Sequence, residues 1–161
     1  MRSDEMPASL QNLRLIIPAM AMGVIVFAAI VVFLITSGGM NTDPEPANLL
    51  LLVLAALAVM ELAAYVVIRK VMMGNLRRRW VGRPVEDVPP EELARGFQTL
   101  TLVGAALAEG FSLFGLVILL VTGNWLAIAA SAIGLLLIAL HFPTRDKLSR
   151  FAGNVTGQHW S

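Results

Sequence analysis

The chain has 161 residues, of which 57% are apolar and 14% are charged, and its mean hydropathy is +0.76. These values exclude a soluble helical bundle, whose helices need polar outer faces, and they predict a polytopic membrane protein. The chain has no cysteine, which excludes disulfides and thiolate metal sites, and its net charge of +1 says less than where the charges lie.

Four apolar runs predict an all-α fold with four transmembrane helices, arranged as two antiparallel hairpins in a single membrane domain. Each run is near the ~17 to 25 residues that one crossing needs. Outside the membrane we expect a loop over 69–96 and a tail over 143–161, which begins with a short interfacial helix. The four runs cover residues 13–35, 49–68, 97–122 and 125–142.

The first apolar run is longer than the apolar core of a typical secretory signal peptide, and Asp4 and Glu5 dilute its positive start. We therefore interpret this run as a retained helix. The alternative is a cleaved signal peptide, which the small residues Ser37, Gly38 and Gly39 after the run would favour.

The basic residues predict the orientation in the membrane. All of them lie before or at the very start of the first run, between the second and third runs, or after the fourth run, while the other two connections have none. Lysine and arginine are retained on the cytoplasmic side of a membrane. Both termini, the 69–96 loop and the 143–161 tail are therefore expected in the cytoplasm.

The third and fourth runs are separated only by Gly123 and Asn124, a turn pair that predicts a tight antiparallel hairpin. Small residues also recur four positions apart on both runs, which lets helix backbones approach closely in lipid. A small-residue face that this hairpin does not use would favour a homo-oligomer or a larger membrane complex. The pairs are Gly104 with Ala108, Ala106 with Gly110, Ala127 with Ser131, and Ala130 with Gly134.

The third run carries Glu109 near its middle, where a charged side chain is costly and is by default a functional-site hypothesis. We expect it to hold a proton or a cation, and the alternative is an acid that only hydrogen-bonds to a neighbouring helix. Residues at steps of three and four share a helix face, and here they form a polar stripe from the cytoplasmic end to the membrane centre. The stripe consists of Gln98, Thr101, Ala105, Glu109 and Ser112.

The second run carries another acid, Glu61, and Tyr65 one turn further on could donate a hydrogen bond to it. Counted from the ends of their apolar runs, Glu61 is expected about 10 Å and Glu109 about 18 Å from the cytoplasmic boundary. The two acids are therefore not expected to be level. The alternative for Glu61 is a polar group that extends toward the boundary or bonds only to Tyr65.

A basic cluster with an interfacial aromatic, Arg77, Arg78, Arg79 and Trp80, predicts contact with anionic lipid headgroups. The alternative is a topology anchor followed by a solvated loop. One basic cluster is weak evidence for nucleic acid, which we do not expect as a partner. Farther along this loop, Glu91 and Glu92 are expected in the first turn of a helix that starts after Pro90.

The sequence shows no nucleophile with a base, no phosphate-binding glycine loop, and no acid pair with a placed histidine. We therefore do not expect an enzyme, a catalytic residue or a cofactor. His141 and His159 are far apart and have no carboxylate at ligand spacing, so we do not expect a metal site either.

The run from Ala106 to Val117, ALAEGFSLFGLV, resembles the carboxylate-bearing helix of the proteolipid c subunit of rotary ATP synthases. The resemblance implies that Glu109 is an ion-carrying carboxylate and that the second and third helices form a c-like hairpin. The resemblance is limited to this run. In the loop before it, the chain has Gly82-Arg83-Pro84 where the family has Arg-Gln-Pro.

A longer likeness covers both last helices. The chain is similar to uncharacterised small bacterial inner-membrane proteins with a Leu-x-Glu-Gly-x-x-Leu-Phe run, then Thr-Gly-Asn and Pro-Thr-Arg. These are residues 107–114, 122–124 and 143–145 here. The likeness implies a fold and a bacterial inner-membrane location. The main functional hypothesis is a proton or cation site in the membrane, and the alternative is a non-transporting accessory or assembly protein.

Overall fold

The computed structural model describes residues 8–39, 41–84 and 87–157. Over these residues the chain is all-helical, with no strand, which confirms the predicted fold class. The helices are α1 (Ala8–Thr36), α2 (Ala47–Trp80), α3 (Pro90–Thr122), α4 (Leu126–Leu140) and α5 (Arg145–Thr156).

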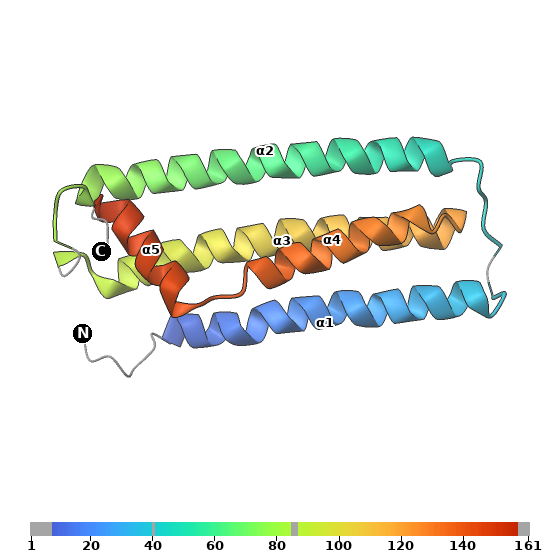
Figure 1. Ribbon diagram of the computed structural model, residues 1–161, viewed down its shortest axis with the longest axis horizontal. Coiled ribbons are helices and arrows are strands. Elements are labelled where there is room, and N and C mark those ends of the chain that lie inside the picture. Colours follow the sequence, from blue (N-terminus) through green and yellow to red (C-terminus); the bar gives the residue numbers. More distant parts are fainter. Residues whose placement is uncertain (1–7, 40, 85–86, 158–161) are drawn as a thin grey trace.

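Helix α3 is the centre of the molecule and contacts each of the other four helices. In Figure 1 the long helices run side by side, with α3 between α1 and α2, and α5 lies across one end. The first two helices, expected as an antiparallel hairpin, each pack on α3 and barely touch each other. Only Ala47 and Leu54 of α2 are buried, so this helix has little surface to share with a second neighbour.

Helices α3 and α4 form the tight antiparallel hairpin that the sequence predicts, and theirs is the most extensive contact between two helices in the described part of the chain. Gly123 ends α3 in the left-handed conformation, with φ of +66°, which glycine adopts without strain. The Asn124 N–H donates to Thr122 Oγ1 (3.1 Å), and Asn124 Oδ1 accepts from the Leu126 N–H (3.0 Å). These bonds satisfy backbone groups at the turn and reverse the chain within a few residues.

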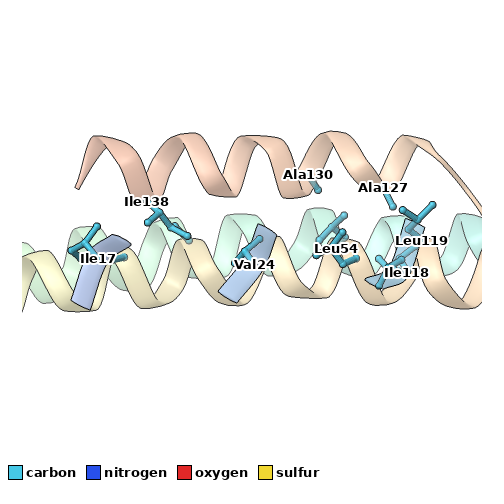
Figure 2. Close-up of a cluster of buried hydrophobic side chains, with 12 residues drawn as sticks. Ile17, Val24, Leu54, Ile118, Leu119, Ala127, Ala130 and Ile138 are labelled. Carbon is cyan, nitrogen blue, oxygen red and sulfur yellow. The ribbon is translucent and has the colours of Figure 1, made fainter. Parts of the chain in front are cut away.

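The main apolar core lies where α1, α2 and α4 meet α3. Figure 2 shows side chains from all four helices converging there. Helix α1 contributes residues spaced seven apart, which fall on one helical stripe. The labelled side chains are Ile17, Val24, Leu54, Ile118, Leu119, Ala127, Ala130 and Ile138.

Three helices, α1, α2 and α3, are long and apolar enough to cross a membrane. Helix α4 has only 15 residues, which span about 22 Å against a hydrocarbon thickness of about 30 Å. It makes a fourth candidate only together with α5, from which it is bent by 74°. The chain therefore has three to four candidate spans, and the large apolar side chains exposed along α2 are suited to lipid.

The segment 69–96, expected as a loop, is mostly helical. Helix α2 continues through Trp80 and α3 begins at Pro90, with Glu91 and Glu92 in its first turn as predicted. The chain stays helical past the apolar run because Arg and Met are good helix formers in water. Arg79 Nη1 lies 3.3 Å from Glu92 Oε1 and links the two helices.

We call the part of the bundle where α1 begins, α2 ends and α3 begins the basic end, because the described arginines and lysines lie toward it (Figure 1). A short helix, α5, begins in the tail where the sequence predicts one, and the Thr144 side chain caps its start by accepting from the Lys147 N–H (3.3 Å). Its apolar side packs into a second core, in which Phe97 and Phe151 meet edge to face with centroids 5.8 Å apart.

Candidate intramembrane carboxylate site

The register between α2 and α3 determines where the two acids Glu61 and Glu109 lie. The two helices are antiparallel, and their contacts follow a constant register along the pair. Near the basic end Arg79 pairs with Glu92, and Leu76 packs against Gly96. Deeper in the bundle the same register brings Glu61 against Gly110.

The Glu61 carboxyl group lies directly against the backbone of α3. A Cβ atom placed on Gly110 would be 3.5 Å from Glu61 Oε1, and nothing else is within 4 Å of that position. Glu61 is half-buried. Because Gly110 follows Glu109, the expectation that the two acids lie at different depths is wrong. The expected depths take the end of each apolar run as the membrane boundary. Both helices continue past those ends, so the two ends are not level with each other.

Glu109 is level with Glu61 but does not form a pair with it. Successive helical residues point about 100° apart, so the Glu109 side chain leaves α3 in a different direction from the Gly110 position that Glu61 contacts. Within the described part of the chain, neither carboxyl group has a hydrogen-bond partner or an ion-pair partner. Glu109 is half-buried, like Glu61.

Tyr65, the expected donor to Glu61, is engaged elsewhere. Its ring meets the His141 ring edge to face, with centroids 5.7 Å apart, and no hydrogen bond joins these described residues Tyr65 and Glu61. His141 Nδ1 is 2.7 Å from the Leu137 carbonyl oxygen. The His141 ring packs on α3 at Gly104, where an added Cβ would clash with it. No sequence pattern indicates this role of His141, because its contacts come from α2 and α3, far away along the chain.

The polar stripe of α3 lies mostly inside the protein. Thr101 and Ser112 are buried, Ala105 is fully buried, and Gln98 is half-buried. Ser112 does not support Glu109, because its hydroxyl donates to the Ser131 carbonyl of α4 at 2.8 Å. Gln98 and Thr101 are therefore the members that remain between Glu109 and the basic end.

A groove runs from the basic end to the part of this stripe that lies nearest that end. Its cavity is about 350 Å³, and Tyr65, Thr101 and His141 line its inner part. Tyr65 is one turn from Glu61 on α2, and Thr101 is two turns from Glu109 on α3. Polar access from the basic end therefore reaches within one or two helical turns of both acids.

The residues of the predicted headgroup cluster over 77–80 lie on different sides of α2. Arg77 faces α5, Arg78 is exposed, and Arg79 pairs with Glu92 of α3. Trp80 packs against the second core, and the Arg83 guanidinium lies 5.4 Å from its ring centroid. Successive helical residues point in different directions, so a run of adjacent basic residues cannot share a face.

Over the described residues 8–39, 41–84 and 87–157, no group of three or more His, Asp or Glu side chains is placed to hold a metal ion. Comparison of the chain with protein-family models, curated proteins and solved structures finds no match. The assignment of a function therefore depends on the geometry described above.

Proposed function

We propose that this is a membrane protein of the bacterial inner membrane in which Glu61 and Glu109 are intramembrane acids that bind and exchange a proton. The observation that carries the proposal is the contact of the Glu61 carboxyl with α3 at Gly110, beside Glu109, with no hydrogen-bond partner for either acid in the described chain. We further propose four crossings, the fourth over residues 125–142, and a cytoplasmic basic end.

Energetics favour a proton at these positions. A charged carboxylate at the membrane centre costs about 2.5–3.5 kcal/mol even on the scales that give the lowest values. Hydrogen bonds between membrane helices recover only about 0.6 kcal/mol on average, and these two acids have none within the described residues. Protonation removes the charge, and it needs one carboxyl, whereas a hard cation such as Ca²⁺ takes six to eight oxygen ligands.

Exchange requires a path for the proton, and the groove at Tyr65 and Thr101 supplies its outer part. From there the stripe continues through Ala105 to Glu109. A proton relay of this kind is a recurrent use of Asp, Glu and His inside membranes. The proposed direction of exchange is with the compartment at the basic end.

The alternative is a non-transporting accessory or assembly protein. It is favoured by one specific observation, which is that Ala106 and Gly110 are exposed on α3, whereas the other small-residue pairs of the hairpin are buried. Small exposed residues allow another helix to approach closely. In this alternative, a helix from a second copy or from a larger complex covers Gly110 and donates a hydrogen bond to Glu61.

Covalent labelling by a membrane-soluble carbodiimide distinguishes the two functions, because the reagent needs a protonated and reachable carboxyl. The purified protein in lipid is labelled, and the adduct is located by peptide mass spectrometry. We expect adducts on Glu61, Glu109 or both, and their selective loss in Glu61→Gln and Glu109→Gln. Glu92→Gln, which removes an acid outside the apolar runs, should leave the adducts unchanged.

Absence of adducts on both residues in folded protein would overturn the exchange proposal and favour the accessory function. That function also predicts that Glu61→Gln shifts the protein from large to small particles in mild detergent. Proton exchange predicts unchanged particle size.

A further inference from the structure

Two adjoining grooves lie where α5 crosses α2 and α3 near the basic end. One has a cavity of about 450 Å³ and the other is the 350 Å³ groove described above. Both are lined by Arg69, Met73 and Asn154, so they form one continuous depression. We call it the α2–α5 groove.

The charged residues that line the α2–α5 groove are all basic. On α2 these are Arg69, Lys70 and Arg77, and on α5 they are Lys147 and Arg150. Both sets follow helical spacing, which turns them toward the same space. Like charges gathered across a groove repel one another, and a bound anion would remove that cost.

These basic residues have no acidic partner among the described residues. By contrast, Arg79 is paired with Glu92 outside this groove, although it is only two residues from Arg77. Lys147 is partly used, because its ammonium donates to the carbonyls of Leu140 (2.6 Å) and Phe142 (2.9 Å) at the end of α4. Arg69 of α2 and Arg150 of α5 have no such bonds, and both line the 350 Å³ part of the groove, one from each helix.

Much of the rest of the lining is apolar or aromatic, beside the polar residues Thr101, His141 and Asn154. Val66, Phe97, Leu100, Leu140 and Phe151 contribute to it. Arg69 directly follows the apolar run of α2, and Leu140 is the last residue of α4. The groove therefore lies at the boundary between the apolar and the charged parts of the helices, where lipid headgroups are found.

We propose that the α2–α5 groove binds the headgroup of an anionic phospholipid. The phosphate lies between Arg69 and Arg150. The part of the acyl chain nearest the headgroup runs along the exposed apolar side of α2, beginning at Val66. Basic pockets between helices at the membrane boundary are suited to such headgroups. A free phosphate would match the charges but would leave the apolar lining unused, so the two parts of the groove together favour a lipid.

Competition between two lipids tests the site. The full-length protein is exchanged into mixed micelles with equal amounts of phosphatidylglycerol and phosphatidylcholine, and the retained lipids are counted by native mass spectrometry. We expect preferential retention of phosphatidylglycerol. Arg69→Gln and Arg150→Gln should each lower this preference about fivefold, and the double variant about 25-fold, from about 1 kcal/mol for each basic residue at a membrane surface.

The matched control removes two positive charges outside the groove, as Arg14→Gln with Arg78→Gln. Arg14 lies at the same end of the bundle, next to Leu13 of the second core, and Arg78 is exposed; neither lines the groove. Equal losses in the two double variants would overturn the proposal, because they indicate attraction by total charge. The double variant Arg69→Lys with Arg150→Lys should retain most of the preference, which shows that a loss in the Gln pair is not misfolding.

A further arm replaces the lipid with inorganic phosphate at matched ionic strength. Protection of the protein against thermal unfolding by phosphatidylglycerol, and not by phosphate, supports the lipid assignment. Equal protection by phosphate alone would overturn it in favour of a small-anion site. The outcome is independent of carbodiimide labelling, which reads the acids deeper in the membrane.

Discussion

Ser112 of α3 and Ser131 of α4 exchange two hydrogen bonds, each hydroxyl donating to the other residue's carbonyl oxygen at 2.8 Å. Both serines are buried. Such a reciprocal pair forms only when two helix backbones lie very close. The adjoining glycines permit this, since a Cβ on Gly115 would be 2.9 Å from the Ala127 carbonyl oxygen. This interface holds α3, and with it Glu109, in place.

Close packing at this interface predicts that Gly134→Ala destabilises the protein by about 1–3 kcal/mol, the usual cost of overpacking. The new Cβ would lie 2.6 Å from Ser112 Cβ and 2.7 Å from the Ala108 carbonyl oxygen, so the backbones must separate. The measurement is the free energy of unfolding in mixed micelles. Gly23→Ala, at a position with nothing within 4 Å, should cost nothing, and equal losses in both variants would contradict the packing account.

The serine hydrogen bonds should matter less than the packing. We expect Ser112→Ala and Ser131→Ala to cost about 0.6 kcal/mol each, the average for hydrogen bonds between membrane helices. A double-mutant cycle on the same unfolding assay measures their coupling. If either serine variant lowers the free energy of unfolding more than Gly134→Ala does, the hydrogen bonds contribute more than the packing, contrary to this prediction.

The ion pair between Arg79 and Glu92 should contribute little to stability. The Arg79 side chain is 71% exposed and the atoms are 3.3 Å apart, so water and salt screen the attraction. We expect Glu92→Gln to change the free energy of unfolding by less than about 1 kcal/mol, with the difference shrinking as salt is added. A larger, salt-insensitive loss would indicate that Glu92 has another structural role.

The docking of α5 should depend on its N-terminal cap. Thr144→Ala removes the acceptor of the Lys147 N–H and should weaken the helix by about 1 kcal/mol, whereas Thr144→Ser should keep it. Hydrogen–deuterium exchange of the α5 amides measures the effect. We expect about fivefold faster exchange in the alanine variant alone, and unchanged exchange would contradict the capping role.

Much of the fold follows from the sequence alone. The Gly123-Asn124 turn and the small residues on both sides of it predict the α3–α4 hairpin, and Pro90 with Glu91 and Glu92 marks the start of α3. The central place of α3 could not be predicted. Helices that face lipid lack the polar side that shows which face of a soluble helix is buried, so apolar runs look alike whatever their neighbours.

The candidate sites depend even more on packing. Glu61 and Glu109 stand out as acids in apolar runs, but their common level follows from how far α2 and α3 extend beyond those runs. The α2–α5 groove joins residues about eighty positions apart in the sequence, from Arg69 to Arg150. Helical spacing of basic residues is visible on each helix, whereas the bend between α4 and α5 that brings the two sets together is not.

The central claim is that Glu61 and Glu109 exchange a proton inside the membrane. Infrared difference spectroscopy of the protein in lipid, recorded across pH, detects the carbonyl stretch of a protonated carboxyl directly. The account predicts a pH-dependent band that weakens in Glu61→Gln or Glu109→Gln and persists in Glu92→Gln. A band that neither membrane variant changes, or no pH-dependent band, would contradict it.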